Sequence, residues 1–280
     1  MKEVTIVLIS YKSENIINNF IKNIPKDIPA IIVENSNNHL MKTNIENNYK
    51  NIKVYLKKND GVSSSLNFAA KKILTKYFLQ ISPDIKFNFN DLHTFLSLAK
   101  KLNDKFSAIG PRFINVRKKS HKQINKNLKF DKINSVHGSC MFINKKCFLE
   151  IGGFDENIFL YFEETEYCYR AKKKKYLSYQ TNEVTVETAG RSVELTKEDQ
   201  QKISNLLMWH FIWSKFYFYK KKYGLFLSNI YFIPIIIRII FKIFLYKITK
   251  NSEKVEKYKF RLDGLLNSIR GKNSFLRIDF

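Results

Sequence analysis

The sequence predicts an α/β fold: a mostly parallel sheet flanked by helices, followed by a helical C-terminal extension that is basic and aromatic. Short, nearly continuous apolar runs alternate with segments of helical spacing through residue 82. This alternation is typical of a doubly wound sheet, whose strands are buried on both faces. After about residue 195 the composition changes to aromatic, aliphatic and basic residues. The 280 residues, 44% of them hydrophobic, suffice for one large α/β domain and a helical tail.

The predicted elements follow one another at short intervals. Runs with the length of a strand alternate with segments of 3.6-residue periodicity. We therefore expect strands at 4–10, 30–35, 52–57 and 77–82 and helices at 14–24 and 63–74. A polar, lysine-rich loop is expected at 115–134, and the apolar pattern returns at 139–151.

Ligands of doubly wound sheets bind outside the carboxyl ends of the strands. Asp84 follows a buried strand in a polar turn, where it can hold a divalent cation, although a turn-forming Pro-Asp pair explains it equally well. In NDGVSSSLN, residues 59–67, a tight turn opens a helix whose N-terminus binds an anion or is merely capped. The residues that directly follow the predicted strands are Ser10, Tyr11, Glu34, Asn35, Ser36, Asn59, Asp60, Gly61, Ser82, Pro83 and Asp84.

The net charge and the cysteine pattern limit the binding partners and the cellular compartment that we expect for this protein. The chain has 49 Lys and Arg against 25 Asp and Glu, a formal net charge of +24. Such a charge favours nucleotides, nucleic acid or acidic lipid as partners, or else reflects a composition rich in Lys, Asn and Ile. Cys140, Cys147 and Cys168 form no disulfide or metal pattern, which suits a reducing cytosol. The N-terminus lacks the length and cleavage site of a signal peptide, so we expect a cytoplasmic protein.

The stretch IGGFDENIFLYFEETEYCYR, residues 151–170, gathers five carboxylates among aromatic side chains. Its two glycines predict a turn with unusual dihedrals or close backbone approach. Glu166 and Arg170 are four residues apart and are expected to pair on one face of a helix that begins near Glu163. Glu164 points to another face, so its carboxylate is a candidate general base, with an ordinary acidic helix start as the alternative.

In order and spacing these segments resemble the inverting family 2 glycosyltransferases of the GT-A fold, particularly the rhamnosyltransferase-like branch. The resemblance covers about residues 4–192. It implies a GT-A type, Rossmann-like domain at 1–200 and leaves a helical, membrane-associating region at 201–280. It rests on TIVLISYKSEN, IIVENSNN, NDGVSSSLNFAA, YFLQISPDIKF and, most specifically, HGSCMFINKKCFLEIGGFDENIFLYFEETEYCYR.

The resemblance implies a role at each matching position. Asp84 matches the final acid of the D-x-D-like metal motif, which implies Mg²⁺ or Mn²⁺. Glu164 matches the catalytic base, with Glu163 beside it and Arg170 orienting the acids. The interleaved aromatic side chains are expected to line the acceptor side. The implied donor-binding residues are Ser10, Tyr11, Glu34, Asn59, Gly61, Asn67, Asp84 and Gly138.

Three positions depart from the family pattern. Ser82 begins Ser-Pro-Asp where the family often has Asn-Pro-Asp, and the base is a Glu rather than an Asp. Glu187, five residues before Ser192, stands where the family often has a His. Glu187 is therefore a candidate second metal ligand or a plain surface acid.

The implied reaction is a single in-line displacement that inverts the anomeric configuration. Glu164 removes the proton of the acceptor hydroxyl, and the charge of the departing nucleoside diphosphate is met by a cation at Asp84 and by basic groups. The implied partners are a nucleoside diphosphate sugar and a glycan or lipid-linked acceptor. The resemblance thus implies hexosyltransferase-type chemistry in bacterial surface polysaccharide synthesis.

Two other functions compete with this interpretation. A sugar nucleotidyltransferase also uses a nucleotide-binding α/β sheet, but SYKSEN, which follows the first strand, lacks the glycines of its phosphate loop. A basic nucleic-acid-binding protein needs a stacking or groove-binding module, which is not apparent, and the acids of 155–166 would repel phosphate. We therefore expect no nucleic-acid partner.

The segment GLFLSNIYFIPIIIRIIFKIFLYKI, residues 224–248, is long enough to span a bilayer. Arg238 and Lys242 interrupt its most apolar part and share one helical face. Pro234 is expected to kink or start the helix. An apolar helix with a basic stripe favours the membrane interface, so we expect peripheral attachment to the inner face of the cell membrane. A core helix packed on the catalytic domain is the alternative.

Overall fold

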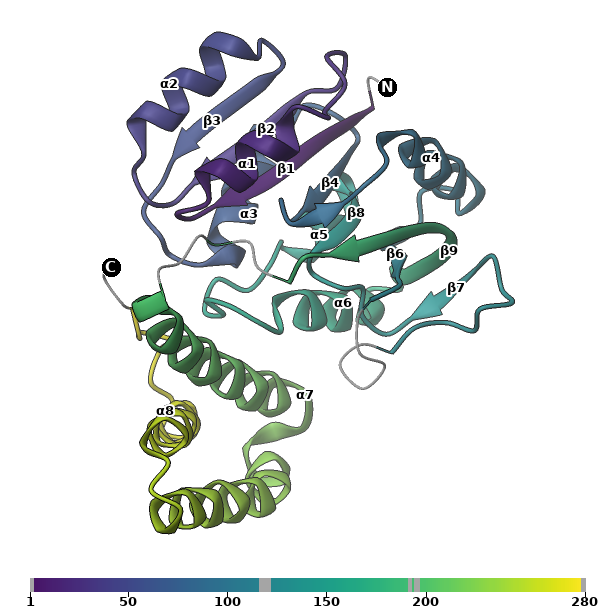
Figure 1. Ribbon diagram of the computed structural model, residues 1–280. Helices are drawn as coiled ribbons and strands as arrows, with labels where there is room; N and C mark the ends of the chain where they lie inside the picture. The colour runs from purple at the N-terminus through teal and green to yellow at the C-terminus, as the bar shows by residue number, and fades with distance from the viewer. Residues whose placement is uncertain (1–2, 116–121, 191–192, 194–196, 278–280) are drawn as a thin grey trace. The chain divides into compact units, whose positions relative to one another are not determined.

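The computed structural model describes residues 3–115, 122–190, 193 and 197–277. The chain forms two compact units. The first comprises Met1–Asp155 and Glu164–Glu194, and the second comprises Glu156–Glu163 and Leu195–Phe280. Figure 1 shows the sheet and flanking helices of the first unit and the long helices of the second.

The N-terminal half of the first unit is the parallel part of the sheet. Its neighbours run in the order β3-β2-β1-β4, and the four strands lie within one residue of the predicted ranges. Among the helices α2 was not predicted, because it buries only Met41 and Ile45 and shows little periodicity. The elements are β1 (Val4–Ser10), α1 (Glu14–Ile21), β2 (Ala30–Glu34), α2 (His39–Asn48), β3 (Ile52–Leu56), α3 (Val62–Lys72) and β4 (Tyr77–Ile81).

The remaining strands make the sheet mixed. β8 (Cys140–Asn144) is antiparallel to β4 and to β6 (Phe106–Phe113), which pairs in parallel with β9 (Leu177–Thr188). β5 (Ile85–Lys86) and β7 (Phe130–Ile133) both pair with β9. β7 lies inside the segment expected to be a loop. Its side chains stay at least partly exposed, so its main-chain pairing leaves no hydrophobic signal.

Two hydrophobic clusters cover the two faces of this sheet. One joins alternate strand residues such as Ile6 to α1, α2 and α4 (Leu92–Lys101), which follows the turn η1 (Phe89–Asp91). The other joins residues such as Val7 to α3, α5 (Lys145–Ile151) and α6 (Glu163–Lys173). Because consecutive strand residues point to opposite faces, the sheet is anchored on both sides, and the ends of its strands are fixed in place.

The second unit is helical, as the sequence predicted for this part of the chain. It contains α7 (Lys197–Ile248) and α8 (Ser252–Ile269). α7 is broken at Gly224, where φ is 81° and ψ is 168°, whereas Pro234 lies inside the helix. Pro234 therefore does not start the helix. The break lies at Gly224 because a positive φ strains residues that carry a Cβ, and Gly224 has none. We call residues 197–223 and 225–248 the first and second segments of α7.

By length and composition, α7 could cross a membrane. The stretch that qualifies is Asp199–Ile248, and only 17% of its most apolar window of 18 residues is buried. A core helix of a soluble protein is mostly buried by comparison. The apolar surface of that window is therefore largely directed outward.

Two aromatic residues of the acidic stretch lie in the interiors of the two units. Phe154 is 2% exposed and packs on Phe148 and Tyr167 in the first unit. Phe159 is 8% exposed and lies against His210 in the second unit, with ring centroids 4.6 Å apart. These two rings therefore fill cores and do not form the acceptor-side lining that the sequence suggested.

Candidate functional site

A cleft of about 480 Å³ lies at the carboxyl ends of β1 and β2. It has polar and charged sides and an apolar contribution from one methionine. The helices α1 and α2 begin beside it, and most of its lining comes from the end of β2 and the loops that lead into these helices. The lining residues are Lys12, Ser13, Glu14, Glu34, Ser36, Asn38 and Met41.

Glu34 shapes this cleft through its fully buried carboxylate. One carboxylate oxygen accepts hydrogen bonds from the backbone N–H of Ser36, at 2.9 Å, and from the Ser36 hydroxyl. The other oxygen accepts from the N–H of Asn38 at 2.7 Å. These bonds fix the loop that follows β2, so the polar groups on the cleft side are ordered before any ligand arrives.

Asn38 extends this order to the neighbouring helices. Its side-chain oxygen accepts from the N–H of Met41 at 2.9 Å and so caps α2. Its amide nitrogen donates to Glu14 at 2.8 Å, which links α2 to the first turn of α1. Neither Asn38 nor Glu14 was predicted as a site residue, although Asn38 follows the predicted strand at 30–35 and Glu14 begins the predicted helix at 14–24.

Ser10 supports the cleft from behind. Its side chain is fully buried and lies 3.1 Å from the hydroxyl of Ser13 and 3.9 Å from the sulfur of Met41. The contact residues of the cleft include Glu34 but neither Ser10 nor Tyr11. Glu34 thus lines the cleft and Ser10 lies one layer below it, and their predicted contact with a nucleoside stays a prediction.

Asp84 lies in the turn after β4, at the same edge of the sheet. One of its carboxylate oxygens accepts from the Thr188 hydroxyl at 2.6 Å and from the N–H of Gly190 at 3.1 Å. The N–H of Ser82 donates to the carbonyl of Ser139 at 2.8 Å. Ser139, just before β8, therefore adjoins the Ser82–Asp84 turn, and the predicted donor contact of the neighbouring Gly138 stays a prediction.

The Asp84 carboxylate fits a hard divalent cation as one ligand. Its Oδ2 accepts the hydrogen bonds from Thr188 and Gly190, and Oδ1 of the half-buried side chain is the oxygen that could bind a cation. Mg²⁺ is commonly bound by one or two carboxylates together with substrate phosphates and water. Among the described residues no cluster of three or more His, Cys, Asp or Glu exists that could enclose a metal by itself. A cation at Asp84 would therefore depend on diphosphate oxygens for its remaining ligands.

Glu187 is not joined to Asp84 in this geometry. It pairs with Lys86 across the β5–β9 ribbon, at 3.3 Å, and is 42% exposed at its side chain. Consecutive residues of a strand point to opposite faces, and Thr188 uses its face to bind Asp84. The geometry therefore favours the surface-acid alternative for Glu187. Ser192, with which Glu187 was aligned, lies outside the described residues.

Glu164 stands in the first turn of α6. The Thr165 hydroxyl donates to its Oε1 at 3.0 Å, and the Ser135 hydroxyl lies 3.2 Å from that of Thr165. Burial raises the pKa of Glu164, and the bonds from its own backbone N–H and from Thr165 offset part of this effect. A carboxylate whose pKa is raised is a better proton acceptor near neutral pH than an ordinary surface acid. Glu163, beside it, is buried and belongs to the second unit.

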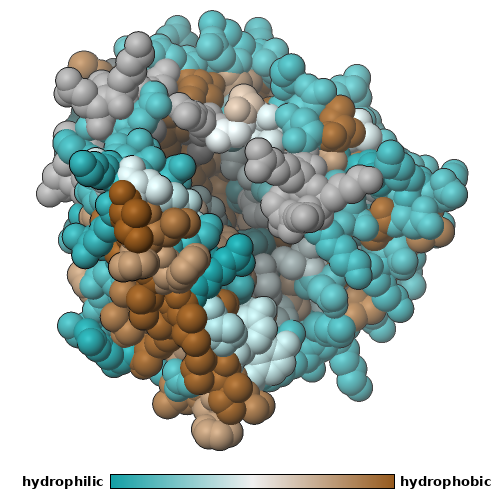
Figure 2. Space-filling model, turned by 60° about the horizontal axis from the view of Figure 1, so that its bottom comes forward, coloured by the Kyte–Doolittle hydropathy of each residue, from teal (hydrophilic) through white to brown (hydrophobic). Residues whose placement is uncertain are grey.

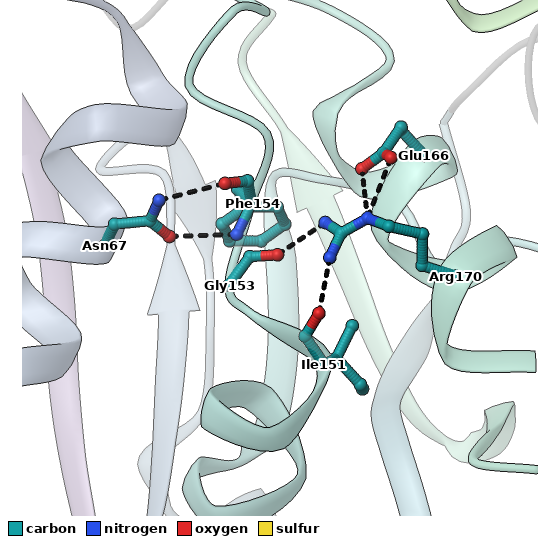
Figure 3. Close-up of polar contacts among 6 residues, drawn as sticks. All are labelled: Asn67, Ile151, Gly153, Phe154, Glu166 and Arg170. Carbon is teal, nitrogen blue, oxygen red and sulfur yellow. Dashed lines mark hydrogen bonds and ion pairs between the residues drawn. The ribbon is translucent and has the colours of Figure 1, made fainter. Parts of the chain in front are cut away.

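Arg170 binds four acceptor atoms around the turn at Gly152 and Gly153, which we call the glycine turn (Figure 3). Its Nε donates to both oxygens of Glu166 at 2.8 and 2.9 Å, which confirms the predicted pair. Its Nη1 and Nη2 donate to the carbonyls of Ile151 and Gly153 at 2.7 and 2.5 Å. The guanidinium thereby attaches α6 to the turn that ends α5, and we interpret Arg170 as a positioning residue.

Asn67 holds the same turn from α3. Its side-chain oxygen accepts from the N–H of Phe154 and its amide nitrogen donates to the carbonyl of Phe154, both at 2.9 Å (Figure 3). Gly153 has φ +67°, and a Cβ there would lie 2.5 Å from the Asn67 oxygen. Asn67, predicted on the donor side, thus binds the glycine turn, and a larger residue at Gly153 would displace it.

Asn59 and Gly61 lie in the turn between β3 and α3. Gly61 has φ 101° and occupies the position before the first residue of α3. Neither residue contributes to the lining of the cleft at β1 and β2. The structure thus confirms the tight turn and the helix start, and their predicted contact with a nucleotide sugar stays a prediction.

Known proteins share this architecture. No family model matches the chain. The mannosyltransferase PcManGT from Pyrobaculum calidifontis, solved with GDP-Man and Mn²⁺, superposes with a TM-score of 0.61 at 11% identity, covering 97% of this chain and 88% of that one. S. aureus TarS 1–349 in complex with UDP-GlcNAc gives 0.56 at 12% identity, over 96% and 92%. The chain has a GT-A-type fold.

One curated relative is also similar in sequence. The low-salt glycan biosynthesis hexosyltransferase Agl10 of Haloferax volcanii is 24% identical over 202 residues, which is 62% of this chain. The chain spans 63% of the length of that relative. The structural neighbours confirm the GT-A fold that the sequence predicted.

Proposed function

We propose that the chain is an inverting glycosyltransferase that moves a sugar from a nucleoside diphosphate donor to a hydroxyl of a glycan or lipid-linked acceptor. The observation that carries the proposal is the edge of the sheet where β1, β2 and β4 end. Because these strands are parallel neighbours, the cleft at Glu34 and the carboxylate of Asp84 share that edge. GT-A neighbours were solved with GDP-Man and Mn²⁺ and with UDP-GlcNAc, which supports a nucleotide-sugar donor.

The chain's own groups divide the work in this reaction. The acceptor oxygen forms a bond to the anomeric carbon while the bond from that carbon to the diphosphate breaks. Glu164 takes the hydroxyl proton, and its raised pKa suits it to that task. Asp84 would hold Mg²⁺ or Mn²⁺, which supplies positive charge to the leaving diphosphate when bound. Attack from the side opposite the leaving group inverts the configuration.

The finer identity follows the resemblance in sequence. We propose hexosyl transfer of the family 2 type, in the rhamnosyltransferase-like branch, in the synthesis of a surface polysaccharide or a lipid-linked glycan. The relative that acts in glycan biosynthesis as a hexosyltransferase supports this class. We further propose a peripheral location on the cytoplasmic face of the cell membrane, with no nucleic-acid partner.

A donor screen tests the proposal. The full chain is incubated with uridine, thymidine and guanosine diphosphate sugars, with and without Mg²⁺ or Mn²⁺, and release of the nucleoside diphosphate is measured. We expect release from one donor class, with the product's anomeric configuration, read by proton NMR, opposite to that of the donor. Retention of configuration would contradict the inverting mechanism, and no release from any donor with glycan and lipid-linked acceptors would contradict the function.

Glu164→Gln is the matched test of the base. Loss of a general base typically lowers the rate by roughly 10²–10⁴-fold, whereas nucleotide binding should persist, because Asp84 and the Glu34 cleft are unchanged. Glu156→Gln, which alters an exposed acid of the same stretch, should keep wild-type turnover. Near-normal turnover of Glu164→Gln would assign the base to another group.

A further inference from the structure

The second segment of α7 has an exposed face made of large apolar side chains. At about 100° per residue these side chains fall within an arc of about 100°, and no charged residue of 225–248 shares that arc. Figure 2 shows a long hydrophobic band on the face turned toward the viewer. We call the set the apolar stripe; its members, each at least half exposed, are Phe226, Ile230, Ile233, Ile237, Ile240, Phe241, Phe244 and Ile248.

The opposite face of the same segment is already used within the second unit. Phe232 and Ile239 are buried in a cluster with Ile212, Phe216 and Leu265, which come from the first segment of α7 and from α8. The stripe is therefore not the side by which the helix packs on its own unit. It is a second apolar face on one helix.

Lys242 lies outside the stripe and makes its contacts within the second unit. Its ammonium donates to the hydroxyl of Tyr258 on α8 at 2.8 Å and lies 5.0 Å from the centre of that ring. Tyr246 also lies against Tyr258, with ring centroids 5.6 Å apart. The segment is thus held along α8, and its central lysine is turned away from the exposed face.

Contact with α8 excludes a simple spanning arrangement. α8 carries exposed charged residues, among them Glu253, Glu256 and Lys259. A bilayer that surrounded the second segment of α7 would also have to surround α8, and charged side chains are rarely tolerated in a hydrocarbon core. An orientation in the plane of the interface exposes only the stripe to the acyl chains.

Basic residues border the stripe on both sides. Arg238 and Lys247 lie about 110° and about 70° from its centre, in opposite directions. On α8 the Nε of Arg261 is buried and has no hydrogen-bond partner among the described residues. Burial and the nearby charge of Arg238 lower the pKa of Arg261. Guanidinium groups that lie near one another, with no carboxylate ion pair in the described part of the chain, are suited to a shared phosphate.

We propose that the apolar stripe inserts into the surface of a bilayer containing anionic phospholipid, with Arg238, Arg261 and Lys247 at the level of the lipid phosphates. The inference rests on the proposed peripheral location and names its docking face and lipid class. Anionic lipid matches both the bordering cations and the net charge of +24. A second copy of the chain fits less well, because a two-fold contact through the stripe would bring the same basic borders toward each other.

Co-sedimentation of the full chain with vesicles tests the docking face. The vesicles are phosphatidylcholine alone or phosphatidylcholine with phosphatidylglycerol. Phe241→Ser with Phe244→Ser should lower the partition coefficient by about tenfold or more, because two exposed rings lose their apolar burial. Leu74→Ser is the matched control, since Leu74 is 97% exposed and lies in the first unit.

A second pair of variants tests the charges. Each basic residue near an anionic surface contributes about 1 kcal/mol, or about fivefold, so Arg238→Gln with Lys247→Gln should weaken binding about 25-fold. Lys71→Gln with Lys105→Gln removes the same charge from the first unit and should have little effect. Binding should require phosphatidylglycerol, and alkaline carbonate should release the chain.

Several outcomes would overturn the inference. They are equal binding by the stripe variant and the wild type, equal binding to both vesicle types, and retention after carbonate, which would indicate a spanning helix. Dimerisation through the stripe in light scattering, without vesicle binding, would assign the face to a second copy. Diphosphate release measured on the same preparation separates the two proposals. An active chain that binds no vesicle contradicts only the docking, and an inactive chain that binds contradicts only the transferase.

Discussion

Replacing Arg170 by Met should destabilise the first unit strongly, because it removes the partner of a buried carboxylate. Glu166 is 0% exposed, and its two oxygens accept from Arg170. Breaking a buried ion pair by removing one member costs about 3–5 kcal/mol. The carbonyls of Ile151 and Gly153 also lose charged donors. Since the Arg170 side chain is 25% exposed, water can replace part of this, and we expect a loss of about 3 kcal/mol.

The double variant Glu166→Met with Arg170→Met gives the matched comparison. It removes the buried charge as well as its partner, and apolar replacement of a whole buried pair is often close to neutral. We therefore expect the double variant to be more stable than Arg170→Met alone. Urea unfolding followed by circular dichroism measures both free energies. If Arg170→Met unfolded at the wild-type urea concentration, or the double variant were the weaker one, the pair would not stabilise the turn as inferred.

Four further results are expected. Asp84→Asn should weaken nucleoside diphosphate binding mainly when Mg²⁺ or Mn²⁺ is present; equal losses in calorimetry with and without EDTA would exclude a metal role. The Glu164 carboxylate must be deprotonated to act as the base, and its pKa is raised, so kcat/KM should fall as the pH drops with a midpoint above 4.5, the ordinary pKa of a glutamate. This pH dependence should disappear in Glu164→Gln. Burial lowers the pKa of His210 from 6.5 to about 4, so stability should be full above pH 6.5 and fall by about 3 kcal/mol between pH 6.5 and 4; a flat urea midpoint over that range, or a fall unchanged in His210→Gln, would contradict this. Gly153→Ala should cost a few kcal/mol in thermal or urea unfolding, because φ is +67° and the new Cβ would meet Asn67; a stable variant would show that the turn relaxes freely.

Much of the fold could be predicted because its elements are encoded by local periodicity. The apolar runs that became β1, β2 and β4 are buried almost throughout, and such runs are recognisable without any partner. The Glu166–Arg170 pair is likewise local, since four residues on a helix form one turn. α2 and β7 were not predicted because their contacts are mostly main-chain or sparse, and neither leaves an apolar pattern. α4, β6 and β9 were also not predicted, although α4 and β6 bury apolar side chains along much of their length.

Three acids of the candidate site could be found from the sequence, but most of the groups around them could not, and the roles of these acids stay predictions. Glu34, Asp84 and Glu164 stand at element ends, where a sequence can be searched for them. The cleft lining from Ser36 and Asn38 depends on hydrogen bonds to Glu34, and Asn67 meets Phe154 across 87 residues of chain. Such contacts are set by which elements become neighbours, and spacing along the chain does not report that.

The sequence by itself determined that the C-terminal part is helical, apolar and basic, because composition and periodicity are properties of the chain alone. Only the tertiary structure decided what each face of that helix does. It placed the break at Gly224, turned Lys242 onto Tyr258, and left eight apolar side chains exposed on one arc. The physical reason is that a helix has several faces of similar hydrophobicity here. Which of them is buried depends on the packing of α8, a separate element whose position no local pattern of α7 encodes.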